Sequence, residues 1–319
     1  MQPLTPIPLA EIQAAAERIQ GLAVRTPLVR LPTPGPAEIW LKLENLQPIG
    51  SFKLRGAGNA LALLSAAQLA DGVYTASAGN MAQGVAFVAR RRSVPCRVVV
   101  PDHAPATKLA AIERLGAEIV KLPFAEWWNV LLQRGRKGMR GWFVHPVSDP
   151  AVIAGNGTIG LEILADLPDV DTVVVPYGGG GLASGIASAL RPLRPTAEVF
   201  AAEVATAAPL AAALAAGAPA PIDYVASFVD GIGGRGLLPE MWPMVRELLA
   251  GSVVVTLEQV ADAIRLLVER NRIVAEGAGA ASVAAALTGR AGAGKIVCVV
   301  SGGNLDPAKL ARILANELP

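Results

Sequence analysis

The chain has 319 residues, of which 52% are hydrophobic and 17% charged, so it is long and apolar enough for roughly two domains with large cores. Its 28 basic and 26 acidic residues give a formal net charge of +2 without a basic block, which argues against nucleic-acid binding and favours small-molecule partners. The start lacks a basic segment before an apolar core, and the alanine-rich run 207–220 is broken by proline and glycine, so we expect a cytoplasmic protein without a membrane segment.

Two residue types argue against common enzyme classes. Cys96 and Cys298 each lie in an apolar, strand-like run, where a buried free thiol is expected. His103 and His145 are the only histidines, and they have no zinc-like spacing with the cysteines. Metalloenzyme and Ser-His-Asp hydrolase interpretations are therefore weak.

The first notable stretch is "QPIGSFKLRGAGNAL", residues 47–61, which places Lys53 at the expected start of a helix. A lysine on the exposed face of an amphipathic helix is the ordinary interpretation. An amine in an apolar pocket is the alternative, because burial lowers the pKa of lysine and makes it a nucleophile. This stretch alone does not decide between the two.

Further along, short apolar runs alternate with small-residue turns and stretches of helical spacing. Such unbroken runs predict parallel strands buried on both faces, and hence a doubly wound α/β sheet whose ligands bind at the carboxyl ends of the strands. The four runs are "GVYTA" at 72–76, "CRVVV" at 96–100, "TVVVPY" at 172–177 and "KIVCVV" at 295–300. The basic, glycine-rich tract 134–143 between them is expected to be a hinge or surface crossover near a domain boundary.

The turns after three of these runs are candidate binding elements. "SAGNMAQG", 77–84, offers Ser77, Asn80 and free backbone N–H groups to a carboxylate, although N-capping explains them equally well. "SGGN", 301–304, repeats this pattern, with helix capping again the alternative. Residues 178–181, four consecutive glycines before an expected helix, suit a phosphate; a flexible loop is the other possibility.

Two nucleotide motifs compete with the phosphate interpretation. Gly178, Gly180 and Ala183 satisfy G-x-G-x-x-A, with Glu198 and Glu203 about twenty residues on, which is the dinucleotide fingerprint. It lies in the middle of the chain rather than in the first βα unit, so an NAD-dependent oxidoreductase stays open as an alternative. Residues 289–295 satisfy G-x-x-x-x-G-K, but an expected strand follows and no Ser or Thr does, so we reject a P-loop.

Together these stretches resemble the fold type II family of pyridoxal-phosphate (PLP) enzymes, in particular its threonine/serine dehydratase branch, which is tryptophan synthase beta-like. The resemblance spans nearly the whole chain. It is carried by "RTPL" at 25–28, "KLENLQPIGSFKLRGA" at 42–57, "SAGNMAQGVA" at 77–86, "VIAGNGTIGLEI" at 152–163, "GGGGLASGIA" at 178–187 and "SGGN".

The resemblance implies a fold of two doubly wound domains with PLP in the cleft between them. It implies a large cofactor-binding domain of residues 1–48 and 146–319, and a small substrate-gating domain of residues 49–145. Lys53 would form the Schiff base with PLP and then take the Cα proton. The other implied cofactor contacts are Phe52, Asn80, Gly178, Gly179, Gly180, Gly181, Gly231, Glu276 and Ser301. The substrate carboxylate would be held by Ser77, Ala78, Gly79 and Asn80.

Departures from the family pattern narrow this implication. Met81 and Asn156 stand where relatives often have histidine and glutamine, which puts the substrate in doubt. Ala78 replaces the second serine of racemases, so racemisation is disfavoured. Pro209 stands where the divalent-cation site of some relatives has an aspartate six residues after the counterpart of Glu203, so we expect no metal. We also expect no C-terminal regulatory domain.

The expected activity is that of a PLP-dependent ammonia-lyase converting L-threonine or L-serine to a 2-oxo acid and ammonia. Ser301 opposite the pyridine nitrogen would leave that nitrogen unprotonated, which favours β-elimination over long-lived carbanion chemistry. A non-catalytic PLP-binding protein, or a relative with another β-elimination or replacement substrate, stays open because of Met81. We expect a homodimer, from the resemblance and from the high apolar fraction.

Overall fold

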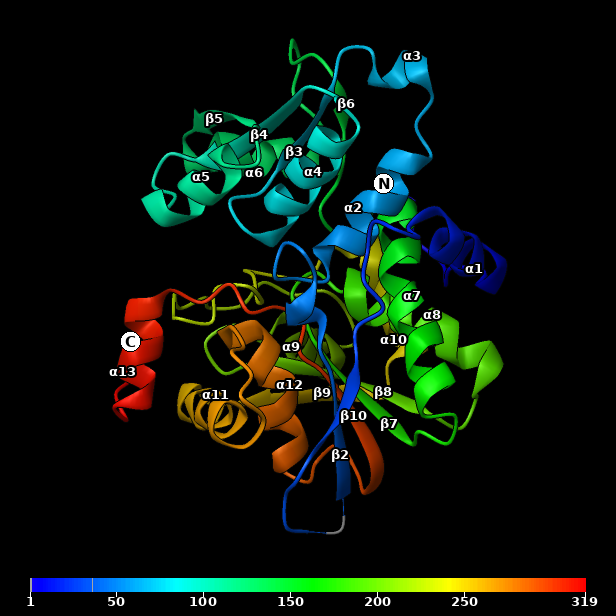
Figure 1. Cartoon of the computed structure of the whole chain (residues 1–319), viewed down its shortest axis with the longest axis vertical. Helices are drawn as coiled ribbons and strands as arrows, with labels where there is room; N and C mark the ends of the chain where they lie inside the picture. Colours follow the sequence, from blue (N-terminus) through cyan, green and yellow to red (C-terminus); the bar gives the residue numbers. More distant parts are fainter. Residues whose placement is uncertain (1, 36) are drawn as a thin grey trace.

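The computed structural model describes residues 2–35 and 37–319 and contains two β-sheets, each covered by helices on both faces (Figure 1). The larger sheet has the strand order β1-β2-β10-β7-β8-β9, and the smaller sheet has the order β5-β4-β3-β6. Every neighbouring pair is parallel except β1 and β2. The expected α/β class with two parallel-sheet domains is therefore confirmed.

The elements fall into two units, called the larger and the smaller unit after the sheet that each contains. Figure 1 shows the two units one above the other, with α2 between them. The strands are β1 Leu28–Leu31, β2 Ala37–Lys42, β3 Val73–Ala76, β4 Cys96–Pro101, β5 Glu118–Leu122, β6 Trp142–Phe143, β7 Thr172–Pro176, β8 Glu198–Val204, β9 Gly251–Val255 and β10 Gly294–Val299. The α-helices are α1 Leu9–Arg18, α2 Lys53–Ala62, α3 Ala66–Leu69, α4 Asn80–Arg91, α5 Ala106–Glu113, α6 Phe124–Leu132, α7 Pro150–Asp166, α8 Gly181–Leu193, α9 Pro209–Ala216, α10 Trp242–Leu248, α11 Leu257–Asn271, α12 Gly277–Leu287 and α13 Pro307–Leu314. Short 3-10 turns, η1 Glu44–Leu46 and η2 Pro239–Met241, complete the set.

The four predicted apolar runs form β3, β4, β7 and β10. Their side chains alternate between the two faces of a sheet, and both faces are buried. In β7, for example, Val174 packs into one core cluster while Val173 and Val175 pack into another on the opposite face. Cys96 and Cys298 are buried free thiols, as expected.

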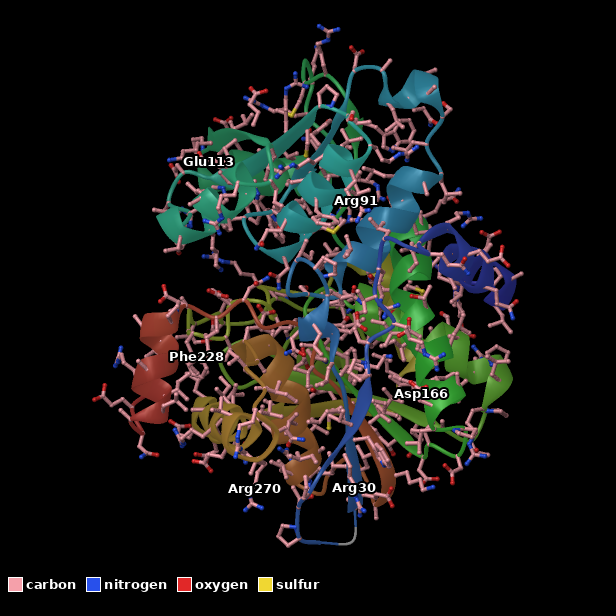
Figure 2. The ribbon with its side chains drawn as sticks, in the orientation of Figure 1. Arg30, Arg91, Glu113, Asp166, Phe228 and Arg270 are labelled. Atoms are coloured by element: carbon pink, nitrogen blue, oxygen red, sulfur yellow. The ribbon has the colours of Figure 1, made fainter. Side chains whose placement is uncertain are left out.

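The tract 134–143 does not cross between the two units, contrary to the expectation. Its last two residues form β6, which pairs with β3, and the Arg136 N–H donates to Tyr74 Oη at 3.1 Å. These contacts keep the tract on the smaller unit, so the chain crosses to the larger unit only after Phe143. The labelled side chains of Figure 2 mark the two units: Arg91 and Glu113 lie in the smaller one, and Asp166, Phe228 and Arg270 lie in the larger one.

Helix α2 begins at Lys53, as predicted, and it is the element shared by the two units. One side packs on α4, and the other packs on α7 so tightly that a Cβ on Gly155 would lie 2.4 Å from the carbonyl oxygen of Arg55. Across residues 2–35 and 37–319, none of the helices combines the length and apolarity that a membrane crossing requires.

Candidate active site

A cavity of about 460 Å³ opens between the two units, at the carboxyl ends of strands from both sheets. This is where doubly wound folds place their ligands. All thirteen predicted site residues line this one cavity: Phe52, Lys53, Ser77, Ala78, Gly79, Asn80, Gly178, Gly179, Gly180, Gly181, Gly231, Glu276 and Ser301. The structure thus assembles residues that are up to 249 positions apart in the sequence, from Phe52 to Ser301.

The Lys53 side chain faces this cavity rather than solvent. Its Nζ donates to the carbonyl oxygen of Pro146 at 3.0 Å and lies 5.1 Å from the centre of the Phe52 ring. Burial lowers the pKa of this amine from 10.5 to about 8, although the nearby Glu276 carboxylate acts in the opposite direction. An amine with this pKa is partly unprotonated near neutral pH, so it can act as a nucleophile or a base.

The glycine tract 178–181 forms a confined turn between β7 and the start of α8. Gly180 is the N-cap of α8 with φ of +93°, a left-handed conformation that favours glycine. A Cβ on Gly179 would lie 2.4 Å from Cγ1 of Val147. These constraints argue against a merely flexible loop. They leave backbone N–H groups and the positive end of the α8 dipole facing the cavity, which is the setting of a phosphate site.

The turn 77–80 does not cap α4 through its side chains. Gly79 is the N-cap residue, and the Ser77 hydroxyl instead accepts a hydrogen bond from the Gly79 N–H at 3.2 Å. The Asn80 amide lies across the cavity and donates from Nδ2 to Oε1 of Glu276 at 2.9 Å. The side chains of this turn are therefore turned to the cavity, where a carboxylate could accept from them.

Asn304, which sequence reasoning had not singled out, determines how the Asn80 amide is oriented. Its Nδ2 donates to Oδ1 of Asn80 at 2.8 Å and to the carbonyl oxygen of Ile49 at 2.9 Å. Because Oδ1 of Asn80 is thus occupied, its Nδ2 must face Glu276. The only sequence signal for this role was that the fourth residue of "SGGN", Asn304, is polar. Its partner Asn80 lies 224 residues away, so the sequence did not indicate the pairing.

The alternative interpretation of "SGGN", helix capping, is wrong. Residues 301–304 lie outside any helix, Ser51 and Gly302 form an isolated β-bridge, and α13 begins only at Pro307, where Asp306 supplies the cap. The backbone N–H of Phe52 donates to the carbonyl oxygen of Ser301 at 3.0 Å. This contact holds the Ser301 segment beside the start of α2, with Ser301 lining the cavity and only 3% exposed.

Glu276 is the N-cap residue of α12, but its side chain makes no capping bond and points to the cavity. Burial raises the pKa of this carboxyl to about 7; the hydrogen bond from Asn80 lowers it, the charge of Asp230 raises it and that of Lys108 lowers it. A Cβ on Gly231 would lie 3.2 Å from Oε1 of Glu276, so the glycine leaves room for this carboxyl.

At the mouth of the cavity, the two units are joined by an ion pair that sequence reasoning had missed. Lys108 Nζ on α5 lies 2.9 Å from Oδ2 of Asp230 in the larger unit. Arg235 of the larger unit also lies over the Phe124 ring of α6, at 5.6 Å. Neither contact could be predicted from the local sequence, because each joins a residue of the smaller unit to a residue of the larger unit that is distant along the chain.

Hydrogen bonds to backbone groups hold the side chains of His145 and Trp127 in place. His145 is buried, its Nδ1 accepts from the Ser148 N–H at 2.8 Å, and burial together with the charges of Arg134 and Lys53 lowers its pKa to about 3. Trp127 lines the cavity and donates from Nε1 to the carbonyl oxygen of Val99 at 3.2 Å.

Glu203 has no free carboxylate to offer a metal or a ribose. Its oxygens accept from the backbone N–H groups of Leu210 and Ala211, both at 2.8 Å, and from the Ser252 hydroxyl at 2.6 Å. Pro209 begins α9, so the carboxylate satisfies the free N–H groups of that helix. The part of the chain that the structure describes contains no cluster of three or more His, Cys, Asp or Glu side chains suited to a metal ion.

The cavity fits the cofactor implied by the resemblance. It combines a glycine turn packed so closely against Val147 that a Cβ on Gly179 has no space, an amine with a lowered pKa, and the small polar side chain of Ser301. The rejected P-loop is also accounted for, because 294–299 forms strand β10 and Lys295 pairs with Asp169.

Comparison with known proteins agrees with this geometry. The sequence profile described as "Pyridoxal-phosphate dependent enzyme" matches residues 19–302. The L-threonine ammonia-lyase of Thermotoga maritima is 40% identical over 318 residues, covering 98% of this chain and 79% of that protein. The catabolic L-threonine dehydratase TdcB of Escherichia coli K12 is 36% identical over 323 residues, covering 97% of this chain and 96% of that protein.

Solved structures give the same result. The processed form of threonine deaminase isoform 2 from Solanum lycopersicum superposes with a TM-score of 0.87 at 30% identity, covering 98% of this chain and 91% of that one. Maize serine racemase also has a TM-score of 0.87 at 30% identity, covering 98% of both chains. These matches favour the PLP interpretation of the glycine tract over a dinucleotide fingerprint: the chain belongs to the family of pyridoxal-phosphate dependent enzymes.

Proposed function

We propose that this protein is an ammonia-lyase that removes water and then ammonia from a β-hydroxy amino acid, converting L-threonine or L-serine to a 2-oxo acid. The observation that carries the proposal is the Lys53 amine, which has a pKa of about 8 and shares one cavity with the glycine cradle 178–181. The relatives named threonine ammonia-lyase and threonine dehydratase support the choice of substrate.

In this proposal, each wall of the cavity has one task. When bound, PLP supplies an electron-withdrawing ring that takes up the electron pair released at Cα. The N–H groups of Gly178 to Gly181 would hold its phosphate, Phe52 and Gly231 would lie beside its ring, and Ser301 would hydrogen-bond its nitrogen. Ser77, Ala78, Gly79 and Asn80 bind the substrate carboxylate through the N-terminal turn of α4.

Lys53 moves the proton. Once its amine is free, Nζ would accept the Cα proton of the substrate and return that proton to the β-hydroxyl, which would leave as water. Asn304 holds the Asn80 amide, and Asn80 in turn donates to Glu276, so these groups keep a defined orientation beside the reacting carbon. The Glu276 carboxyl, with a pKa of about 7, can hold or release a proton near neutral pH.

The lyase is preferred over a racemase because position 78 is alanine, which has no hydroxyl to deliver a proton from the face opposite Lys53. The nearby solved structures include serine racemases, so the distinction needs a direct test. Incubation with L-serine should release pyruvate, and the remaining serine should stay in the L form. Accumulation of D-serine without 2-oxo acid would contradict the proposal.

The central test is covalent. Purified protein with PLP should absorb visible light, and borohydride should erase this band and leave the pyridoxyl group on Lys53. Lys53→Ala should lack the label and lose turnover. A protein that stays colourless with added PLP would sink the proposal. A panel of β-hydroxy and β-substituted amino acids, assayed for 2-oxo acid, identifies the substrate; release from none of them would indicate a non-catalytic PLP-binding protein.

We further propose domains 1–48 with 146–319 and 49–145, a homodimer, and a cytoplasmic location. The dimer is supported by apolar side chains exposed on the surface, among them Phe124, Trp128 and Leu132 on α6. Sedimentation should give a dimer at micromolar concentration, and a monomer there would contradict this. Cell fractionation tests the location.

A further inference from the structure

A buried cluster of four charged side chains lies behind the cavity, on the opposite side of α2 from Lys53. Lys42 at the end of β2, Glu44 in η1 and Arg55 in α2 have side chains that are 0%, 0% and 1% exposed. Glu162 of α7 completes the cluster and is 17% exposed. The four formal charges cancel, so the cluster is neutral as a whole.

Arg55 is the centre of this cluster and uses its whole guanidinium. Nε and Nη2 each donate to a different oxygen of Glu44 at 2.8 Å. Nη1 and Nη2 donate to the two oxygens of Glu162 at 2.6 and 2.8 Å. The remaining partners are Thr158 Oγ1 and the carbonyl oxygen of Val24, both at 3.1 Å. Two bidentate pairs fix both the position and the plane of the side chain.

Lys42 connects the cluster to the larger sheet. Its Nζ donates to Oε2 of Glu162 and to the carbonyl oxygen of Thr26, both at 2.6 Å. The Thr26 hydroxyl donates to Oε1 of Glu44 at 2.6 Å. Arg55 therefore joins α2 to η1, to α7 and to the segment before β1. Lys42 and Thr26 join β2, α7, η1 and that segment to one another. None of these links involves the smaller sheet.

A cluster of this kind is poorly explained by stability alone. Burying four charges costs a large desolvation free energy, and apolar side chains of similar volume often stabilise a protein as well or better. What bidentate pairs supply is a single geometry, because the helix cannot slide or rotate without breaking several of them. The best-attested use of buried charges is accordingly to fix register.

The geometry of α2 shows what this register controls. Lys53 and Arg55 are two residues apart, so their side chains point about 200° apart around the helix, one to the cavity and one to the cluster. Helix α7 in turn contacts α8 directly, since a Cβ on Gly185 would lie 2.4 Å from the carbonyl oxygen of Ile153. Because α8 begins at the glycine cradle, α7 is the common support of the cradle and of Lys53.

We propose that the Lys42–Glu44–Arg55–Glu162 cluster is a positioning device that locks α2 onto α7, and thereby fixes the amine of Lys53 relative to the glycine cradle. A cofactor held at its phosphate by 178–181 and at its reactive end by Lys53 needs these two points at a constant separation. The cluster holds that separation from the side of α2 that faces away from the cavity.

The test uses two substitutions and two controls. Arg55→Lys keeps the charge but loses the fork, and Glu162→Gln removes one bidentate partner while leaving Arg55 and Glu44 paired. Glu118→Gln makes the same chemical change in an ion pair of the smaller sheet, 3.0 Å from Arg97. Leu267→Ala destabilises the core on α11, where the side chain is fully buried, without touching α2.

The decisive readout is the titration of Lys53 in the cofactor-free protein, followed by its rate of modification with an amine reagent against pH. In wild type and both controls the apparent pKa should be about 8. In Arg55→Lys and Glu162→Gln it should rise towards 10.5, because the amine gains access to water. The titratable groups that face Lys53 are the Glu276 carboxyl and the His145 imidazole, and neither variant changes them.

The loaded enzyme gives the second readout. Displacing the amine by about 1 Å should lower kcat on the order of 10- to 100-fold with little change in KM, and should weaken the circular dichroism of the visible band. If the two cluster variants lose stability as Leu267→Ala does, yet keep the wild-type Lys53 titration, dichroism and kcat, the cluster is merely structural and the proposal is wrong. If Arg55→Lys does not fold, Glu162→Gln decides.

This inference rests on the proposed role of Lys53 but not on the substrate. The lysine titration needs no cofactor and no turnover, so it stays informative even if the protein releases no 2-oxo acid. A failure of the ammonia-lyase proposal therefore leaves the positioning test standing, and a normal titration in the cluster variants refutes the positioning role alone.

Discussion

The substitution Gly179→Ala tests the phosphate cradle most directly. Gly179 lies in the turn between β7 and α8, and its backbone is not in the left-handed region, so alanine is allowed there conformationally. The added Cβ would, however, lie 2.4 and 2.7 Å from the two methyl carbons of Val147 and 3.1 Å from its Cβ. Val147 is branched and cannot swing its methyl groups far, so the glycine turn has to move.

The size of the effect follows from this contact. Forcing one extra carbon into a packed site costs about 1–3 kcal/mol. If the turn has to bear that cost when it closes around a phosphate, PLP binding weakens by roughly 5- to 150-fold, since about 1.4 kcal/mol corresponds to a factor of ten. Removing the opposing methyl groups should restore the space, so Val147→Ala combined with Gly179→Ala should recover most of the affinity.

The assay titrates cofactor-free protein with PLP and, separately, with pyridoxal, which has no phosphate. Gly179→Ala should weaken PLP binding and leave pyridoxal binding nearly unchanged. Gly251→Ala on β9 is the matched control, because the added Cβ would meet only the Phe200 ring, at an ordinary contact distance of 3.4 Å. Equal losses for PLP and pyridoxal, or no rescue by Val147→Ala, would show that the glycine turn does not hold the phosphate.

Three further predictions address neighbouring groups. Ser301→Ala should keep PLP bound but lower turnover by roughly 10- to 1000-fold, the range for losing one positioned polar group; full turnover, or loss of the cofactor, would remove the electronic argument for β-elimination. The Glu276 carboxyl has its pKa raised from 4.5 to about 7, so the stability it contributes is complete below pH 4.5 and is lost as pH rises through 7. Denaturation of the cofactor-free protein should therefore show wild type losing stability between about pH 4.5 and 7 relative to Glu276→Gln, and parallel pH profiles would refute this. Chelation of metal ions with EDTA should leave turnover within about twofold, because the Glu203 carboxylate already accepts three hydrogen bonds and is not free to bind a metal. Glu203→Ala should instead lower the free energy of unfolding by about 1–3 kcal/mol, since the buried N–H groups of Leu210 and Ala211 lose their acceptor.

The local sequence was sufficient to predict the elements whose formation depends mainly on neighbouring residues. The apolar runs that became β3, β4, β7 and β10 are buried on both faces, and a strand of that kind needs no information from elsewhere to be recognised. The start of α2 at Lys53 and the turn at 178–181 were likewise readable, because glycine and the change of period mark them. The thirteen expected site residues were implied by the family resemblance and not by local physics, and they line one cavity because the carboxyl ends of strands from both sheets face it.

Other features depend on residues that meet only after both sheets have formed. "SGGN" had the composition of a helix start, yet its backbone pairs with Ser51 and Phe52 and no helix begins there. Lys53 alone could have been an exposed lysine; the packing of α2 between α4 and α7 turns it to the cavity.

The orientation of the Asn80 amide and the partners of Arg55 show the same limit most clearly. Asn304 lies 224 residues from Asn80, and Glu162 lies 107 residues from Arg55. The sequence by itself determined which side chains are available to donate and accept. Which of them pair was decided only by the tertiary structure. A hydrogen bond requires its two atoms to lie about 3 Å apart, and the number of residues between the partners along the chain does not determine that distance.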